Sequence, residues 1–132
     1  MNKMCSQNDA TDQHDKIRRL VVDDIRIFNF EADYCRNTDE FRALYPDKWT
    51  TGPYYDECWL DNDMGYNSPG GDVIKLVKEI EAMAHYGDRL PIGVFVIHTS
   101  NPVAAHEIAT ALNNAHYKVR RVDANDYLYF AP

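Results

Sequence analysis

Residues 91–102 read PIGVFVIHTSNP and contain the most hydrophobic run of the chain, followed at once by four polar residues. The apolar run mixes β-branched and aromatic side chains without a polar interruption, which is typical of a strand buried in a parallel sheet. Pro102 stands where the first residue of a helix is expected, and Asn101 before it is a favourable N-cap. We therefore expect residues 91–97 to form the central strand of a sheet and a helix to begin at Pro102.

Two earlier apolar runs also end in polar residues. Residues 20–22 read LVV and lead into Asp23-Asp24, and residues 57–60 read ECWL and lead into Asp61-Asn62-Asp63. Apolar residues recur at helical spacing after Asp72, between the second and third of these runs. The alternation of strands and helices predicts an α/β fold: a three-layer, doubly wound, mostly parallel sheet of about five strands, covered on both faces.

The remaining elements are less regular in sequence. We expect a second strand within residues 27–37, a short helix from Asn37 to near Pro46, a loop over 47–56, a strand over 117–122, a turn over 123–126 and an edge strand over 127–130. Residues 1–16 are polar and lack apolar periodicity, so we predict a disordered leader followed by a single domain over residues 17–132.

Composition narrows the classes of function. The chain has 132 residues and a formal net charge of −7, which disfavours a broad nucleic-acid surface, and no apolar run is long enough to span a membrane. Cys5, Cys35 and Cys58 form no CxxC or Cys/His pattern, so a zinc site is not expected. The same cysteine pattern favours a reducing compartment such as the cytoplasm. The expected partner is a small phosphorylated ligand, and a homodimer is left open.

Ligands of open parallel sheets bind outside the carboxyl ends of the strands, where the three polar clusters should meet. Carboxylates at such an edge suit a hard divalent cation, Mg²⁺ or Mn²⁺, and the predicted metal ligands are Asp23, Asp24 and Asp61. A calcium loop is excluded because Tyr66 stands where glycine is required. An alternative is that these acids only cap helices or face solvent.

His98 follows the third strand, and because an imidazole ordinarily titrates near neutrality it is the predicted acid or base, with Asp61 and Asp63 completing the catalytic set. The helix that starts after Asn101 presents free amides and a partial positive charge to a phosphate. The predicted substrate-binding residues are therefore Thr99, Ser100 and Asn101, with Arg26 as a phosphate clamp and Asn62 beside them. Helix capping alone would also explain Asn101.

The order of these motifs resembles receiver domains of two-component signalling, in which Asp61 would be the phosphoacceptor. A closer resemblance is to the cyclic-phosphate processing receiver domains, whose pattern is an aspartate pair, then LDHDLG, then HSANP. This chain has LDNDMG at residues 60–65 and HTSNP at 98–102, over a resemblance that covers roughly Arg18 to Asn114. The resemblance implies a receiver-like, flavodoxin-like topology and binding or hydrolysis of cyclic or terminal phosphates. Asn62 replaces the histidine of the family pattern.

The sequence thus predicts a metal-assisted phosphoesterase that acts on a cyclic or terminal phosphate of a nucleotide or RNA end. Two other classes of function remain. Because Asn62 replaces a family histidine, the domain could bind and sequester a nucleotide without turnover. It could also be a receiver-like signalling domain phosphorylated at Asp61.

Overall fold

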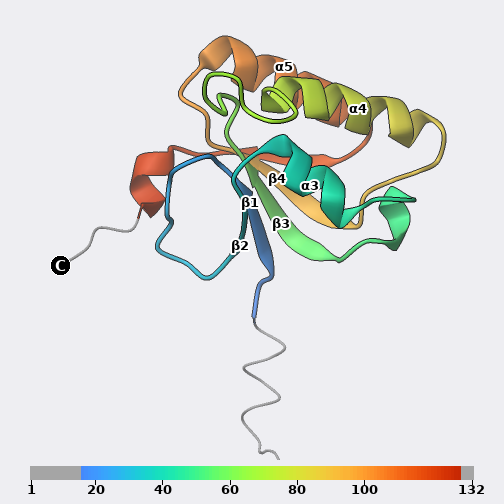
Figure 1. Cartoon of the computed structure of the whole chain (residues 1–132), viewed down its shortest axis with the longest axis horizontal. Helices are drawn as coiled ribbons and strands as arrows, with labels where there is room; N and C mark the ends of the chain where they lie inside the picture. The colour runs from blue at the N-terminus through green and yellow to red at the C-terminus, as the bar shows by residue number, and fades with distance from the viewer. Residues whose placement is uncertain (1–15, 129–132) are drawn as a thin grey trace, which may run out of the picture.

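The computed structural model describes residues 16–128, which contain a five-stranded sheet in the order β2-β1-β3-β4-β5 (Figure 1). Every neighbouring pair of strands is parallel. The strands are β1 (Arg19–Val22), β2 (Asp33–Cys35), β3 (Tyr55–Leu60), β4 (Ile92–Ile97) and β5 (Lys118–Arg121). The predicted α/β class and receiver-like topology are confirmed.

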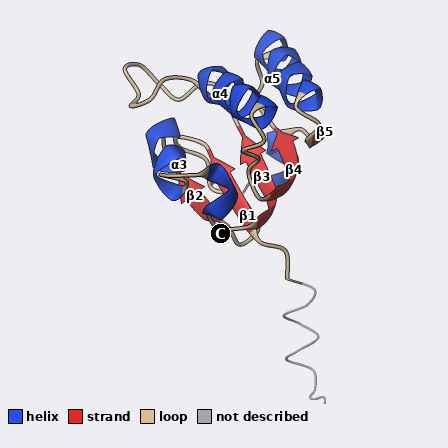
Figure 2. Cartoon of the chain, turned by 90° about the vertical axis from the view of Figure 1, so that its right-hand side faces the viewer, coloured by secondary structure: helices blue, strands red, loops and turns tan. Residues whose placement is uncertain are grey.

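Three α-helices cover one face of this sheet (Figure 2). They are α3 (Thr38–Leu44), α4 (Val73–His85) and α5 (Pro102–Asn114), and each connects one strand to the next in the sequence. Their apolar sides share a large buried cluster with alternate strand residues such as Leu20, Leu60 and Phe95. Three successive connections lie on one face because right-handed crossovers running in the same direction along a sheet return over the same side.

The opposite face is covered without an α-helix. Residues 24–32 connect β1 to β2, and the short 3₁₀ helix η2 (Ala124–Tyr127) lies beside them at the left of Figure 1. The two segments are joined where the amide of Asn29 donates to the carbonyl of Tyr127 at 2.7 Å. Trp59 and Val96 pack with Phe28 in a smaller buried cluster on this side. The third layer of the fold therefore consists of a loop and a 3₁₀ turn.

Several local expectations need correction. The middle strand of the sheet is β3, not the strand formed by residues 92–97, because β4 has only β5 beyond it. Residues 47–56 are not all loop, since they contain the 3₁₀ helix η1 (Trp49–Thr51) and the start of β3. The predicted turn over 123–126 is largely η2, and Leu128 forms an isolated antiparallel bridge to Phe28 rather than part of an edge strand.

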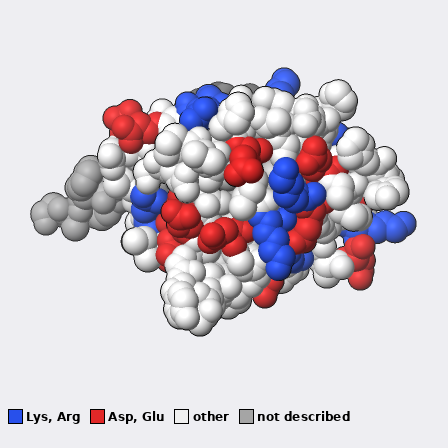
Figure 3. Space-filling view, turned by 90° about the horizontal axis from the view of Figure 1, so that it is seen from above, with Lys and Arg blue, Asp and Glu red and all other residues white. Residues whose placement is uncertain are grey.

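The rest of the predicted edge strand, residues 129–130, lies outside the described residues, as do Cys5 and nearly all of the predicted leader. The division into a leader and a single domain stays a prediction. Among residues 16–128, no helix is both long and apolar enough to cross a membrane. Figure 3 shows acidic and basic side chains interspersed on the side seen from above.

Two glycines with similar backbone conformations provide a test of how closely the turn before α4 packs against α3. Gly70 has φ +85° and a Cβ there would press on side chains of Thr38, Asp39 and Arg42, whereas Gly87 has φ +83° and open space around it. Both alanine variants should suffer the left-handed backbone penalty, about 1 kcal/mol. Only Gly70→Ala should also displace these side chains of α3, so we expect it to lower the free energy of unfolding by roughly 1 kcal/mol or more beyond Gly87→Ala.

Urea denaturation of the two variants measures this difference. Equal losses of stability would show that the turn at Gly70 does not depend on close packing against α3.

Candidate functional site

The register of the sheet brings three predicted residues to one edge. Val22 pairs with Leu60, and Leu60 pairs with Ile97, so the residues that follow each strand end are neighbours. The amide of Asp61 donates to the Val22 carbonyl at 3.1 Å, and the amide of His98 donates to the Leu60 carbonyl at 3.0 Å. Because these hydrogen bonds extend the ladder, Asp23, Asp61 and His98 have well-defined positions at the carboxyl edge.

Asp23 is fully buried and organises the loop that follows β1. Its Oδ1 accepts hydrogen bonds from the amides of Ile25, at 3.1 Å, and Arg26, at 3.0 Å. Its Oδ2 accepts from the guanidinium Nη1 of Arg26 at 3.1 Å. The Asp23 carboxylate thus stabilises the turn that follows β1 and fixes the Arg26 side chain near the strand ends.

Asp61 contacts the same guanidinium nitrogen: its Oδ2 accepts a hydrogen bond from Arg26 Nη1 at 2.9 Å. Burial and the adjacent charge of Asp23 raise the pKa of Asp61, while the Asn62 amide and the Arg26 charge oppose the shift. Burial alone would lower the pKa of Arg26, but hydrogen bonds and charges from both aspartates outweigh it and raise the pKa above its ordinary value. The two buried carboxylates therefore depend on a cation between them.

Asp23, Asp24 and Asp61 each offer a carboxylate oxygen, and these oxygens lie within 4.8 Å of one another. Such a set of oxygen donors suits a hard divalent cation, and the three residues are those predicted as metal ligands. These three residues, called the acid cluster below, fit a metal of this class.

His98 lies behind this cluster in an aromatic setting. Its ring meets Phe28 edge-on at 5.1 Å between centroids and lies 6.0 Å from the Trp59 ring. Nδ1 is 3.8 Å from Asp23 Oδ2, too far for a hydrogen bond, and neither buried ring nitrogen has a hydrogen-bond partner within the described part of the chain. Burial lowers the pKa of His98 to about 4, although the charge of Asp23 opposes this shift. The imidazole is neutral at pH 7.

A cavity of about 280 Å³ opens beside these groups. Its lining residues come from the β1 loop, the β4–α5 connection and the segment after β5: Arg26, His98, Thr99, Ser100, Val122, Asp123, Ala124 and Asn125. A second cavity, of about 340 Å³, is lined mainly by residues near the amino ends of β1 and β2, and it contains none of the predicted residues. The carboxyl-edge cavity is the one that adjoins the acid cluster.

The other predicted residues have mixed positions. Asn101 caps α5 by accepting the Ala104 amide at 3.1 Å, while Thr99 and Ser100 line the cavity. Asn62 is buried, and its side-chain oxygen accepts the Ile74 amide at the start of α4. Asp63 is exposed, and its carboxylate accepts from the Asn62 amide group. The structure therefore brings neither Asn62 nor Asp63 into the cavity lining or the acid cluster.

Sequence reasoning missed residues that support this site. Arg36 follows β2, and its Nη1 donates to the carbonyls of Asp23, at 3.0 Å, and Arg26, at 2.8 Å. Phe28 and Trp59 enclose His98, and the segment after β5 supplies one wall of the cavity. Trp59 carried the one usable signal, since it lies two positions before Asp61 in the predicted strand.

Comparison with known proteins identifies a family for most of the chain. The sequence profile of the family described as Cyclic-phosphate processing Receiver domain matches residues 18–114. The chain belongs to this family. No curated protein and no solved structure gives a significant match. The matched range includes the acid cluster and α5 but ends before β5, so the wall formed by residues 122–125 lies outside it.

The buried imidazole predicts a pH dependence of stability. His98 takes up a proton near pH 6.5 in the unfolded chain but only near pH 4 in the folded protein. Between these values the unfolded state binds more protons, so stability should rise with pH from 4 to 6.5 and level off above, by at most roughly 3 kcal/mol.

His98→Gln should lose this part of the pH profile. Urea denaturation of both proteins from pH 4 to 8 measures the difference, with His106→Gln, an exposed site in α5, as the matched control. Parallel profiles for wild type and His98→Gln would contradict a buried neutral imidazole.

Proposed function

We propose that this domain is a metal-assisted phosphoesterase that opens or removes a cyclic or terminal phosphate on a nucleotide or RNA end. The observation that carries the proposal is His98, a buried neutral imidazole whose ring nitrogens lack partners within residues 16–128, beside the acid cluster and the 280 Å³ cavity. A polar group buried without partners is costly, and such groups are retained where they serve a ligand or a reaction.

Charge supports a phosphate as the ligand. The cavity is lined by Arg26, whose planar fork matches phosphate oxygens, and by Thr99 and Ser100 just before α5. Helix α5 begins just after these residues, and the partial positive charge of its N-terminus favours an anion at this end. Family membership supports the same class of ligand, since the family is described by cyclic-phosphate processing.

The acid cluster supplies the second half of the proposal. Asp23, Asp24 and Asp61 would hold Mg²⁺ or Mn²⁺, which stabilises negative charge on phosphate oxygens and lowers the pKa of bound water. In hydrolysis, a water oxygen forms a new bond to phosphorus and one ester P–O bond of the ring breaks. Neutral His98 would accept a proton from the attacking water, and the imidazolium formed would return this proton to the leaving ester oxygen.

The alternative to an enzyme is a non-catalytic module that binds a nucleotide. Asn62 replaces the histidine of the family pattern, and its side chain serves the start of α4. If turnover needs an acid or base at that position, the domain would bind the phosphorylated ligand and release it unchanged. Turnover measurements therefore decide between the two functions.

The test is incubation of the protein with 2′,3′-cyclic and 3′,5′-cyclic nucleotides and with an RNA bearing a 2′,3′-cyclic end, in the presence of Mg²⁺ or Mn²⁺. We expect phosphomonoester products that are lost by about a hundredfold or more in Asp61→Asn and in His98→Ala. Asp47→Asn and His106→Ala change exposed residues outside the site and serve as matched controls.

Tight nucleotide binding without product in the wild-type protein would overturn the enzyme and favour the sequestering module. Transfer of label from a small phosphodonor to the protein, abolished in Asp61→Asn, would instead favour a receiver-like signalling domain.

A further inference from the structure

The guanidinium of Arg26 lies between two of the three carboxylates assigned to the metal. A single nitrogen, Nη1, is 3.1 Å from Asp23 Oδ2 and 2.9 Å from Asp61 Oδ2. The Asp23 side chain is fully buried and that of Asp61 is 9% exposed. Two buried carboxylates at this spacing repel each other strongly, so the folded chain supplies its own cation to them.

A divalent cation bound to the same two carboxylates would supply that charge in place of the guanidinium. Mg²⁺ and Mn²⁺ coordinate carboxylate oxygens directly, at distances much shorter than a hydrogen bond to nitrogen. An oxygen that coordinates the metal cannot keep its hydrogen bond from Nη1 in the same direction, and two cations in this space would repel each other. The metal and the Arg26 side chain therefore compete for Asp23 and Asp61.

The cavity beside the acid cluster can accommodate the displaced Arg26 side chain. Arg26 lines the 280 Å³ cavity together with Thr99 and Ser100, and its side chain is 28% exposed, so the side chain already borders that space. Its backbone is held independently, by Asp23 Oδ1 at the amide and by Arg36 at the carbonyl. The side chain can turn while the loop stays in position.

We propose that Arg26 is a competing internal cation: it neutralises Asp23 and Asp61 when no metal is bound, and it is displaced into the cavity, toward the phosphate, when a divalent metal enters. This inference rests on the metal site of the proposed function and adds the coupling between metal and phosphate. Metal binding frees the guanidinium for phosphate, and phosphate draws the guanidinium away from the carboxylates. Each ligand should therefore raise the affinity for the other.

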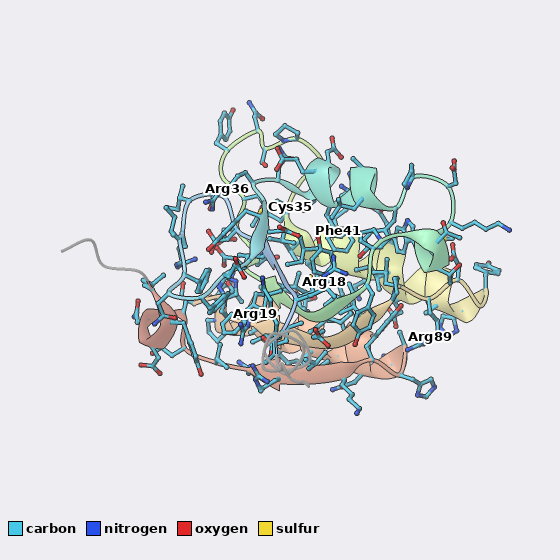
Figure 4. All side chains as sticks on the ribbon, turned by 90° about the horizontal axis from the view of Figure 1, so that it is seen from below. Arg18, Arg19, Cys35, Arg36, Phe41 and Arg89 are labelled. Atoms are coloured by element: carbon cyan, nitrogen blue, oxygen red, sulfur yellow. The ribbon has the colours of Figure 1, made fainter. Side chains whose placement is uncertain are left out.

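Direct measurement of Mn²⁺ binding tests the proposal without an activity assay. Isothermal titration of the full chain with Mn²⁺ alone, at pH 7 and physiological salt, should give affinities roughly fivefold or more tighter for Arg26→Gln and Arg26→Ala than for wild type. The matched control is Arg18→Gln, which makes the same change of net charge at the amino end of β1. Figure 4 shows Arg18 apart from Arg36, the arginine that contacts the Arg26 carbonyl. The control should bind Mn²⁺ as wild type does.

A second titration measures the coupling between Mn²⁺ and phosphate. Addition of inorganic phosphate should tighten Mn²⁺ binding more in wild type than in Arg26→Gln, because only the wild-type protein has a guanidinium to transfer. A direct contact between phosphate and metal would contribute equally in both proteins and cancels in this comparison.

Affinities of both Arg26 variants within twofold of wild type would overturn the competition while leaving the metal site in place. No Mn²⁺ binding at millimolar concentration in any protein would instead remove the metal from the proposed function, and this inference with it. If the Arg26 variants fail to fold, as judged by circular dichroism, the side-chain NMR signal of Arg26 in the wild-type protein is followed during a Mg²⁺ titration. An unchanged signal at saturation would overturn the proposal.

Discussion

The carboxylate of Asp23 determines how the carboxyl edge of this sheet is built. It lies fully buried directly after β1, where one oxygen holds the amides of Ile25 and Arg26 and the other holds the Arg26 guanidinium. A buried carboxylate is tolerated because charged and hydrogen-bonding partners surround it. The turn after β1, the position of Arg26 and the charge balance at Asp61 all follow from this one group.

This arrangement depends on a β1–β2 connection without an α-helix. The loop over residues 24–32 lies on the face of the sheet opposite the α-helices, where Phe28 packs on Trp59 and His98. A helix in this connection would need one continuous apolar face for packing. The loop instead brings an arginine and an aromatic wall to the acid cluster.

The acid cluster and the cavity share Arg26, which links two groups of residues with different chemistry. On one side are oxygen donors suited to a hard cation, and on the other are the hydroxyl groups of Thr99 and Ser100, which can donate hydrogen bonds to a phosphate. His98 lines the cavity as a neutral imidazole packed against Phe28, with Nδ1 3.8 Å from Asp23 Oδ2. Family membership and this separation of charge both agree with a phosphorylated ligand.

The strands that form the site and the residues at their ends could be predicted from the sequence, because buried parallel strands are short apolar runs whose first polar residue marks the edge. It predicted Asp23, Asp61 and His98 in this way, and Asn101 by its capping pattern. Three features became visible only in the folded chain: β3 is the middle strand, Asn62 supports α4, and Arg26 bridges two aspartates. Strand order, register and side-chain direction arise from contacts between residues far apart in the chain, such as Arg26 with Asp61, and local periodicity carries no record of them.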